Sequence, residues 1–434
     1  MNSNELQETA GRKTTAPQGD SPSLSLTVTA GTCLASVFAA LLYFLARTSS
    51  AYTPFRSLGT THYNHASHFV LKDNFVGNSF LQAWKWEIMN DPTHGRVNYI
   101  DQASALQKNL TFANNHKFVM RADSNTVVPP QARGRDSIRI TSYEAYDDAI
   151  FVLDLQHMPE GCSTWPAFWS LSKDGPWPHG GEIDIIEGVN LNTQNLASLH
   201  TTPSCTMPQC AITQVNPPSN VPQHTPSSPT SADCDATVNY NQGCGVSFSD
   251  SASFGSTYNA IGGGVWAMQK TRARGVQVWF WRRDDPNMPP EVRSGAGVLA
   301  PVNPGWGRPA ATFGCESCEY DQHFNAHQLV FDLTFCGDWA GSVWPNSGCG
   351  PSTCEDFVNN NPKAFKNAYW EINALRVYTP DEPSLREGPG PKAALGAATV
   401  FPPLHCPKEL RYIAQPPDHT HLRSRAPPPP DPAI

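Results

Sequence analysis

The sequence predicts an all-β fold, a sandwich of two antiparallel sheets, from its composition and from the pattern of its apolar residues. Aromatic residues make up 10% of the 434 residues and charged residues only 16%, while Gly (31) and Pro (40) are frequent. This composition favours short strands joined by turns over helices rich in Glu, Lys and Ala. Short runs of alternating apolar and β-branched residues recur between turn residues, with no alternating helical pattern. We therefore expect many strands and few long helices.

These runs lie between residues 67 and 380, which we expect to form one domain of a size common for β-sandwiches. The clearest runs are Phe118–Ala122, Ser137–Thr141, Ile150–Leu155, Gly275–Trp281, Leu329–Leu333 and Trp370–Val377. Residues 203–233 are rich in Pro, Ser and Thr and predict a long loop. Residues 381–434 are Pro-rich without apolar periodicity and predict a disordered tail.

The first 66 residues predict a targeting region ahead of this domain. Residues 1–23 form a polar leader, residues 24–46 carry no charge and are long enough to cross a bilayer, and residues 47–66 read as a linker. Two interpretations stay open, a cleaved signal or an uncleaved anchor that leaves the rest of the chain outside the cytosol. Both place the protein in the secretory pathway, either secreted or anchored in the membrane, at the cell surface or wall.

Cysteine usage agrees with export. Outside the apolar segment and the tail lie ten cysteines: Cys162, Cys205, Cys210, Cys234, Cys244, Cys315, Cys318, Cys336, Cys349 and Cys354. In an oxidising compartment this even set predicts disulfide bonds, whose pairing the sequence leaves open. The alternative is a zinc site at the C-x-x-C of Cys315 and Cys318, but no second pair follows at finger spacing. The sequon at Asn109 is a candidate N-glycan site.

The net charge of −8 and the pI near 5.9 argue against a nucleic-acid partner. Binding to phosphates needs a clustered basic surface, and the sequence has none. A neutral polymer remains a suitable ligand.

Three acidic residues, Glu182, Asp184 and Glu187, lie in one short segment that reads Gly-Glu-Ile-Asp-Ile-Ile-Glu-Gly. Because side chains alternate faces along a strand, the first two acids share one face and the isoleucines between them point to the other. In an unbroken strand the third acid would join the apolar face, where an unpaired charge costs several kcal/mol. The sequence therefore predicts a β-bulge near Ile185 and Ile186, which returns Glu187 to the acidic face.

This spacing suits a retaining glycosidase. Four effective strand steps of roughly 3.3 Å separate the two Glu Cα atoms by about 13 Å. Side chains that lean inward on a concave sheet would bring the two carboxyl groups to about 5 Å, the separation of a nucleophile and an acid/base. Repulsion among three acids should raise at least one pKa, as a general acid requires. The alternatives for the bare motif are a solvated polar face or a Ca²⁺ site.

Aromatic residues surround this segment in the sequence. Trp165 and Trp169 precede it in a Thr-Trp-Pro-Ala-Phe-Trp run, and Trp177 lies five residues before Glu182. Flat aromatic side chains can pack on the C–H faces of sugars, although single Trp residues also serve in cores. His200 follows the segment and could hydrogen-bond Asp184 or a sugar hydroxyl.

The ordered set of motifs resembles glycoside hydrolase family 16, with the closest likeness to the fungal laminarinase-type endo-1,3(4)-β-glucanases. The resemblance covers roughly residues 67–380. The motifs that carry it are Thr164–Trp169, Gly181–Val189, Leu199–Thr202, Gly262–Met268, Phe335–Gly341 and Ala368–Asn373. It implies a β-jelly-roll sandwich with the glucan in a cleft across the concave sheet.

The resemblance also implies roles for single residues. The catalytic residues would be Glu182 as nucleophile, Glu187 as acid/base and Asp184 as their assistant. The residues expected to contact substrate are Trp169, Trp177, His200, Trp339 and Arg139. Phe168 stands where a second Trp of a Trp-Trp pair is expected. No organic cofactor is required and no metal ligand is assigned, although a structural Ca²⁺ on the convex side would match the family.

Together these points predict a monomeric retaining endo-β-glucanase that hydrolyses internal β-1,3 or mixed β-1,3/1,4 linkages of glucans such as laminarin by double displacement. Two alternatives come from other classes. A cell-wall β-glucan transglycosylase would share the covalent intermediate. An inactive glucan-binding protein would be expected to lack one Glu, whereas both are present.

Overall fold

The computed structural model of this protein describes residues 68–207, 228–300, 304–314 and 316–381. The leader, the apolar segment and the linker, predicted over residues 1–66, lie outside these ranges, as do residues 382–434 of the Pro-rich tail predicted over residues 381–434. Within the described ranges, no helix is both long and apolar enough to span a membrane.

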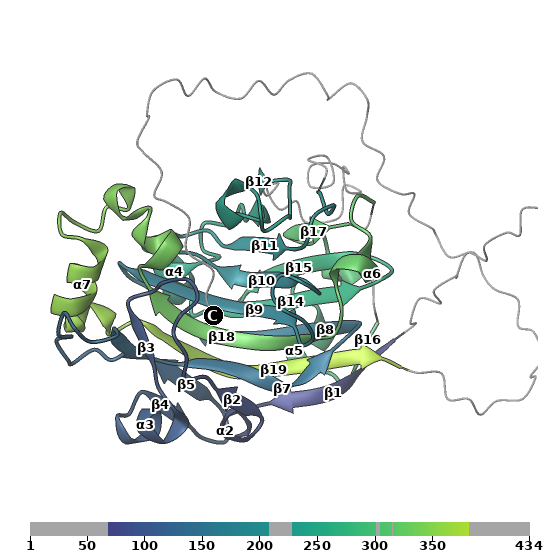
Figure 1. The fold of residues 1–434 in the computed structure, drawn as a ribbon. Coiled ribbons are helices and arrows are strands. Elements are labelled where there is room, and N and C mark those ends of the chain that lie inside the picture. Colours follow the sequence, from purple (N-terminus) through teal and green to yellow (C-terminus); the bar gives the residue numbers. More distant parts are fainter. Residues whose placement is uncertain (1–67, 208–227, 301–303, 315, 382–434) are drawn as a thin grey trace, which may run out of the picture. The chain divides into compact units, whose positions relative to one another are not determined.

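Two large antiparallel sheets dominate the described chain and are layered against each other in Figure 1. The nine-stranded sheet has the order β16 (Val298–Leu299), β1 (Phe69–Phe75), β19 (Tyr369–Pro380), β8 (Ala149–His157), β14 (Gly264–Thr271), β15 (Gly275–Arg282) and β17 (Ala311–Phe313); β5 (Phe118–Arg121) also pairs with β19, and β4 (Thr111–Ala113) pairs with β5. The eight-stranded sheet has the order β12 (Ser228–Ser231), β13 (Cys244–Ser247), β11 (Leu196–His200), β10 (Glu182–Glu187), β9 (Thr164–Ser172), β18 (His327–Phe335), β7 (Arg139–Tyr146) and β2 (Trp84–Trp86). The predicted two-sheet sandwich is confirmed.

The remaining elements are short, as the composition predicts. Strands β3 (Val97–Tyr99) and β6 (Arg135–Ser137) form a small parallel pair. The α-helices are α2 (Ser79–Gln82), α3 (Gln102–Gln107), α4 (Gly255–Ala260), α5 (Pro290–Ser294), α6 (Tyr320–His323) and α7 (Cys354–Asn360). The 3-10 helices are η2 (Asn239–Asn241), η3 (Pro304–Trp306), η5 (Trp344–Asn346) and η6 (Pro362–Phe365), and η4 (Gly337–Gly341) is a π-helical turn.

The main hydrophobic core lies between the two sheets. It contains large aromatic side chains from both, such as Phe168 and Phe331 from one sheet and Trp266 and Trp370 from the other. A second cluster, which includes Val265 and neighbouring side chains, covers the opposite face of the nine-stranded sheet. The eight-stranded sheet therefore buries one face in the main core and turns its other face outward.

Four disulfide bonds join described cysteines: Cys162–Cys349, Cys205–Cys318, Cys234–Cys244 and Cys336–Cys354. The predicted use of cysteines in disulfides is confirmed for these eight. Because Cys318 is bonded to Cys205, it is not available for the alternative zinc site. Cys210 and Cys315 lie outside the described residues.

The loop predicted over residues 203–233 is only partly described, since residues 208–227 are not. Its last part differs from the prediction, because Ser228–Ser231 form strand β12 at the edge of the eight-stranded sheet. Pairing with β13 satisfies backbone groups of this segment despite its turn-forming composition. Two disulfide-bonded cysteines, Cys205 and Cys234, lie on either side of residues 208–227 in the sequence.

Candidate active site

Strand β10 carries the three acids and contains the predicted bulge. Against β9, Asp184 pairs with Trp169 but Ile186 pairs with Phe168, so Ile185 is the extra residue. Against β11 the register shifts in the same interval. The prediction of a bulge at Ile185 and Ile186 is confirmed.

The bulge sorts acidic from apolar side chains. Ile183, Ile185 and Ile186 are buried in the main core. Glu182 and Glu187 are half-buried on the outward face, and Asp184 between them is only 3% exposed. Each buried Ile stabilises the fold by roughly 1.5–3 kcal/mol, so the register that exposes the acids is strongly favoured.

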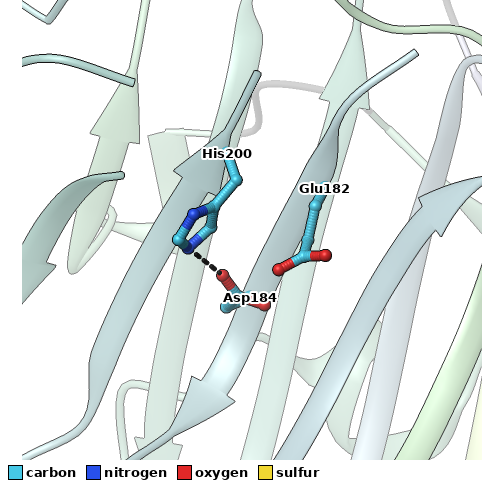
Figure 2. Close-up of side chains that lie close together, drawn as sticks. All are labelled: Glu182, Asp184 and His200. Carbon is cyan, nitrogen blue, oxygen red and sulfur yellow. Dashed lines mark ion pairs between the residues drawn. The ribbon is translucent and has the colours of Figure 1, made fainter. Parts of the chain in front are cut away.

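Asp184 and His200 form an ion pair beside Glu182. His200 Nε2 lies 3.3 Å from Asp184 Oδ2, and its Nδ1 lies 2.9 Å from the side-chain oxygen of Asn241. Figure 2 shows His200 reaching from the neighbouring strand toward Asp184, with Glu182 on the same strand as Asp184. Burial lowers the pKa of His200, but its contact with Asp184 and the charge of Glu182 outweigh burial and raise it to about 10. The imidazole is therefore a cation at neutral pH.

Glu182 accepts a hydrogen bond from the indole of Trp177, with 2.7 Å between Nε1 and Oε2. Burial, followed by the charge of Asp184, raises the pKa of Glu182 to about 7. The cation of His200 and the indole bond counteract this rise. Trp177 is 46% exposed, so part of its ring remains available to a ligand.

Glu187 accepts a corresponding hydrogen bond from Trp165 Nε1, at 2.8 Å. Burial, followed by the charge of Asp184, raises the pKa of Glu187 well above its usual range. Trp165 in turn packs edge-on against Trp339, with the ring centroids 5.7 Å apart. The predicted substrate residue Trp339 thus lies next to the side chain that binds Glu187.

Arg139 and Trp169 are brought together on the same outward face. The Arg139 guanidinium lies 5.0 Å from the centre of the Trp169 ring. Both contact Asp332 of β18, which lies 3.6 Å from Arg139 and accepts a hydrogen bond from Trp169 Nε1 at 3.1 Å. Burial raises the pKa of Asp332 to about 7, against the opposing charge of Arg139.

Phe168 points away from this face. It is buried in the main core and stacks on Phe331, with the ring centroids 4.3 Å apart. Its replacement of the expected Trp therefore changes the core and not the outward face.

The sequence did not reveal the roles of Trp165 and Asn195 at the site. Trp165 was grouped with other aromatic residues but was not assigned to a carboxylate. Trp165 and Trp169 are four positions apart on one strand, so strand alternation places both on one face, and this signal could have identified Trp165. Asn195, whose side-chain amide bonds the backbone at the bulge, stands just before β11 without any pattern that marks it.

The described residues contain one group of three His, Cys, Asp or Glu side chains with ligand atoms within 4.8 Å of one another, formed by Glu182, Asp184 and His200. This group does not suit Ca²⁺, which takes oxygen ligands, because one of its three ligand atoms is an imidazole nitrogen. We assign no metal ligand and derive no catalytic step through a metal.

The curated proteins similar to this chain include a probable glycosidase and several endo-1,3(4)-β-glucanases. A family model described as an XgeA-like catalytic GH16 domain matches residues 84–378. A probable glycosidase of Schizosaccharomyces pombe is 40% identical over 314 residues, which cover 72% of this chain and 70% of that protein. A probable endo-1,3(4)-β-glucanase of Neosartorya fischeri is 38% identical over 319 residues, which cover 71% of this chain but only 45% of that longer protein.

Solved structures give the same relationship. GH16 laminarinase 16A from Phanerochaete chrysosporium, solved with 6-O-glucosyl-laminaritriose in its donor and acceptor sites, is 43% identical with a TM-score of 0.66, and the match covers 72% of this chain and 100% of that one. An elongating GH family 16 β-1,3-glucosyltransferase is 34% identical with a TM-score of 0.63, over the same shares. These similarities and the two packed sheets confirm the predicted jelly-roll fold.

Proposed function

Because the chain belongs to glycoside hydrolase family 16, we propose that it is a retaining endo-β-glucanase that cuts internal β-1,3 linkages. The observation that carries this proposal is the outward row of Glu182, Asp184 and Glu187 on bulged strand β10. The printed names of the relatives, endo-1,3(4)-β-glucanase and laminarinase, support the substrate class.

The first step forms a glycosyl-enzyme. A Glu182 carboxylate oxygen attacks the anomeric carbon, the bond from that carbon to the leaving oxygen breaks, and Glu187 donates its proton to that oxygen. The pKa of Glu187 is raised well above its usual range, which keeps the proton available, whereas the pKa of Glu182 is about 7. The cation of His200 further favours the ionised form of Glu182.

The second step returns the enzyme to its starting state. Glu187, now a carboxylate, takes a proton from water while the water oxygen attacks the anomeric carbon and displaces Glu182. Two inversions give net retention. The predicted carboxyl separation near 5 Å is part of this proposal.

Partly exposed aromatic residues beside the acids supply the glucan contacts in this proposal. Trp177 lies at Glu182, Trp339 lies beside the indole that bonds Glu187, and Trp169 carries the stacked guanidinium of Arg139. Such platforms suit neutral sugars. His200 acts mainly through Asp184 and Glu182.

The test is product analysis on laminarin, lichenan and xyloglucan. Shorter chains with β-configured reducing ends, formed first from laminarin, are expected, and initial release of α-anomers would contradict the mechanism. Glu182→Gln should be inactive, whereas Glu355→Gln, an exposed acid on α7, serves as the matched control. Cleavage of xyloglucan alone would contradict the substrate class.

Transglycosylation is a second candidate, favoured by the similarity to the elongating β-1,3-glucosyltransferase. It differs only in the acceptor, since a sugar hydroxyl replaces water in the second step. Incubation with concentrated laminari-oligosaccharides distinguishes them: products longer than the starting oligosaccharide indicate transfer, and only shorter products indicate hydrolysis.

The described disulfides support a location in the secretory pathway, since such bonds persist in oxidising compartments. The sequon residue Asn109 is also consistent with export. It is exposed just after α3, as the acceptor of an N-glycan must be. After expression in a eukaryotic host, treatment with a peptide N-glycosidase should lower the apparent mass of the protein. Asn109→Gln should abolish this change in mass. Whether residues 24–46 anchor it is tested by fractionating cells and medium; cytosolic protein would contradict the proposed location.

A further inference from the structure

The bulge in β10 interrupts the pairing with β11, and the side chain of Asn195 fills the interruption. Its Oδ1 accepts a hydrogen bond from the backbone N–H of Glu187 at 3.0 Å, and its Nδ2 donates to the carbonyl of Ile185 at 2.9 Å. Between Asp184 and Glu187 no residue of β10 pairs with β11. One side-chain amide thus binds two backbone groups at the interruption, the N–H of Glu187 and the buried carbonyl of Ile185.

Asn195 is itself held firmly. It is fully buried, with 0% of its surface exposed. Its backbone N–H donates to the hydroxyl of Ser253 at 2.9 Å, and its carbonyl accepts from the N–H of Phe248 at 2.8 Å. The hydroxyl of Ser253 donates in turn to the carbonyl of Asp250. The backbone of Asn195 is therefore held by the segment that follows β13, which lies outside strand β10.

The two glutamates differ in this respect. Glu182 pairs with a residue on each side, Leu171 of β9 and His200 of β11, in a regular ladder. Glu187 also has a partner on each side, Ala167 of β9 and Leu196 of β11, but it lies two residues after the extra residue Ile185, where the pairing with β11 resumes. Its N–H is held by a side chain, and its carboxyl group is held by Trp165.

We propose that Asn195 is a positioning residue that aims Glu187 at the leaving oxygen of the substrate. The inference rests on the proposed function, in which Glu187 is the acid/base. Asn195 does not contact the reacting atoms in this account; it fixes the backbone from which Glu187 extends. Small displacements of a catalytic group have large effects on rate.

The test uses two substrates that differ in their need for a proton. In laminarin the leaving group is a sugar oxygen, which needs a proton from the general acid. In dinitrophenyl β-laminaribioside the leaving group is a stable phenolate, which needs no proton. The kcat/KM of the second substrate reports glycosylation without proton donation. Asn195→Ala should lower kcat/KM on laminarin by about 100-fold and on the aryl substrate by less than roughly threefold.

Asn195→Asp provides a second variant of nearly the same shape, in case the Ala variant does not fold. Its Oδ1 can still accept from the Glu187 N–H, but an oxygen replaces the donor that faces the Ile185 carbonyl. We expect the same selective loss on laminarin, smaller than in Asn195→Ala. Asn192→Ala is the matched control, because Asn192 also caps a backbone N–H after β10, that of Val189 at 2.8 Å, but does not touch the bulge.

The outcomes separate this inference from the proposed function. Glu187→Ala should show the same selectivity, more strongly. If it loses both substrates equally, the proposed acid/base role fails. If it is selective but folded Asn195→Ala and Asn195→Asp lose both substrates by one common factor, or lose neither, Asn195 is structural and the inference is overturned.

Discussion

The two ends of strand β10 hold their glutamates in different ways. At one end Glu182 receives the indole bond of Trp177, which comes from the turn before the strand and is 46% exposed. At the other end Glu187 receives the bond of Trp165, which lies within the neighbouring strand and packs against Trp339. The first indole is open to a ligand and the second is supported by protein. The same kind of donor thus serves two half-buried carboxylates, from an exposed indole at Glu182 and from a less exposed one at Glu187.

The charges divide the two ends further. Asp184 raises the pKa of both glutamates after burial, but the pKa of Glu182 stays at about 7 while that of Glu187 is raised well above its usual range. The cation of His200 counteracts the rise at both ends. In the proposed mechanism, these different environments suit Glu182 to the role of nucleophile and Glu187 to that of proton donor.

The largest expected effect comes from deleting each carboxylate. Glu182→Ala removes the group that forms the covalent bond and should lower activity by at least about 10⁴-fold on laminarin and on an aryl laminaribioside. Glu187→Ala should lose about 10²- to 10⁴-fold on laminarin, the usual contribution of general acid–base catalysis, and much less on the aryl substrate in kcat/KM. If both variants lost activity on the two substrates in the same ratio, Glu182 and Glu187 would not have the different roles proposed here.

A second pair of variants should shift the pH profile in opposite directions. The acidic limb of kcat/KM reflects ionisation of Glu182 and the basic limb loss of the Glu187 proton. Asp184→Asn removes a charge that raises both pKa values, so both limbs should move to lower pH. His200→Gln removes a charge that lowers both, so both limbs should move to higher pH.

We expect each of these shifts to be about one pH unit, measured on laminarin over the stable pH range. The limbs report the coupled pair of glutamates, so they should move together. Shifts of the same sign in both variants would contradict the electrostatic account.

The two indoles provide a finer comparison. Hydrogen bonds to charged groups contribute about 1.5–3 kcal/mol, so Trp165→Phe and Trp177→Phe should each lower kcat/KM by about 10- to 100-fold. Because Trp177 is exposed, its variant should also raise KM for laminarin, whereas the variant of the less exposed Trp165 should act mainly on kcat. A rise in KM confined to the Trp165 variant would reverse the proposed division between the ends.

The smallest expected effect comes from Asn241, which contacts His200 beside the Glu182 end of the strand. Its side chain lies 2.9 Å from His200 Nδ1. Loss of one hydrogen bond of about 1 kcal/mol in Asn241→Ala should reduce kcat/KM by about fivefold. The ratio of activities on laminarin and the aryl substrate should stay unchanged, and a selective loss on laminarin would place Asn241 in the pathway of Glu187.

Local alternation predicted much of this site. The acids of β10 had to share one face, and the high cost of burying Glu187 required a bulge, which is present. The order of strands was not predictable, because pairings such as β1 with β19 join opposite ends of the domain without a local signal. The contact of Asp332 with Trp169 was not predictable either, because 163 residues separate the two in the sequence. Asn195 was not predictable because one amide before a strand has no periodicity.

The most direct test of the division between the ends is to trap the covalent intermediate. A laminaribiosyl fluoride with fluorine beside the anomeric carbon should form the glycosyl-enzyme but release it slowly, because fluorine destabilises both transition states while fluoride leaves readily. Tandem mass spectrometry of the peptide that contains β10 then locates the sugar. The account predicts one laminaribiosyl group on Glu182; a group on Glu187 or Asp184 would contradict it.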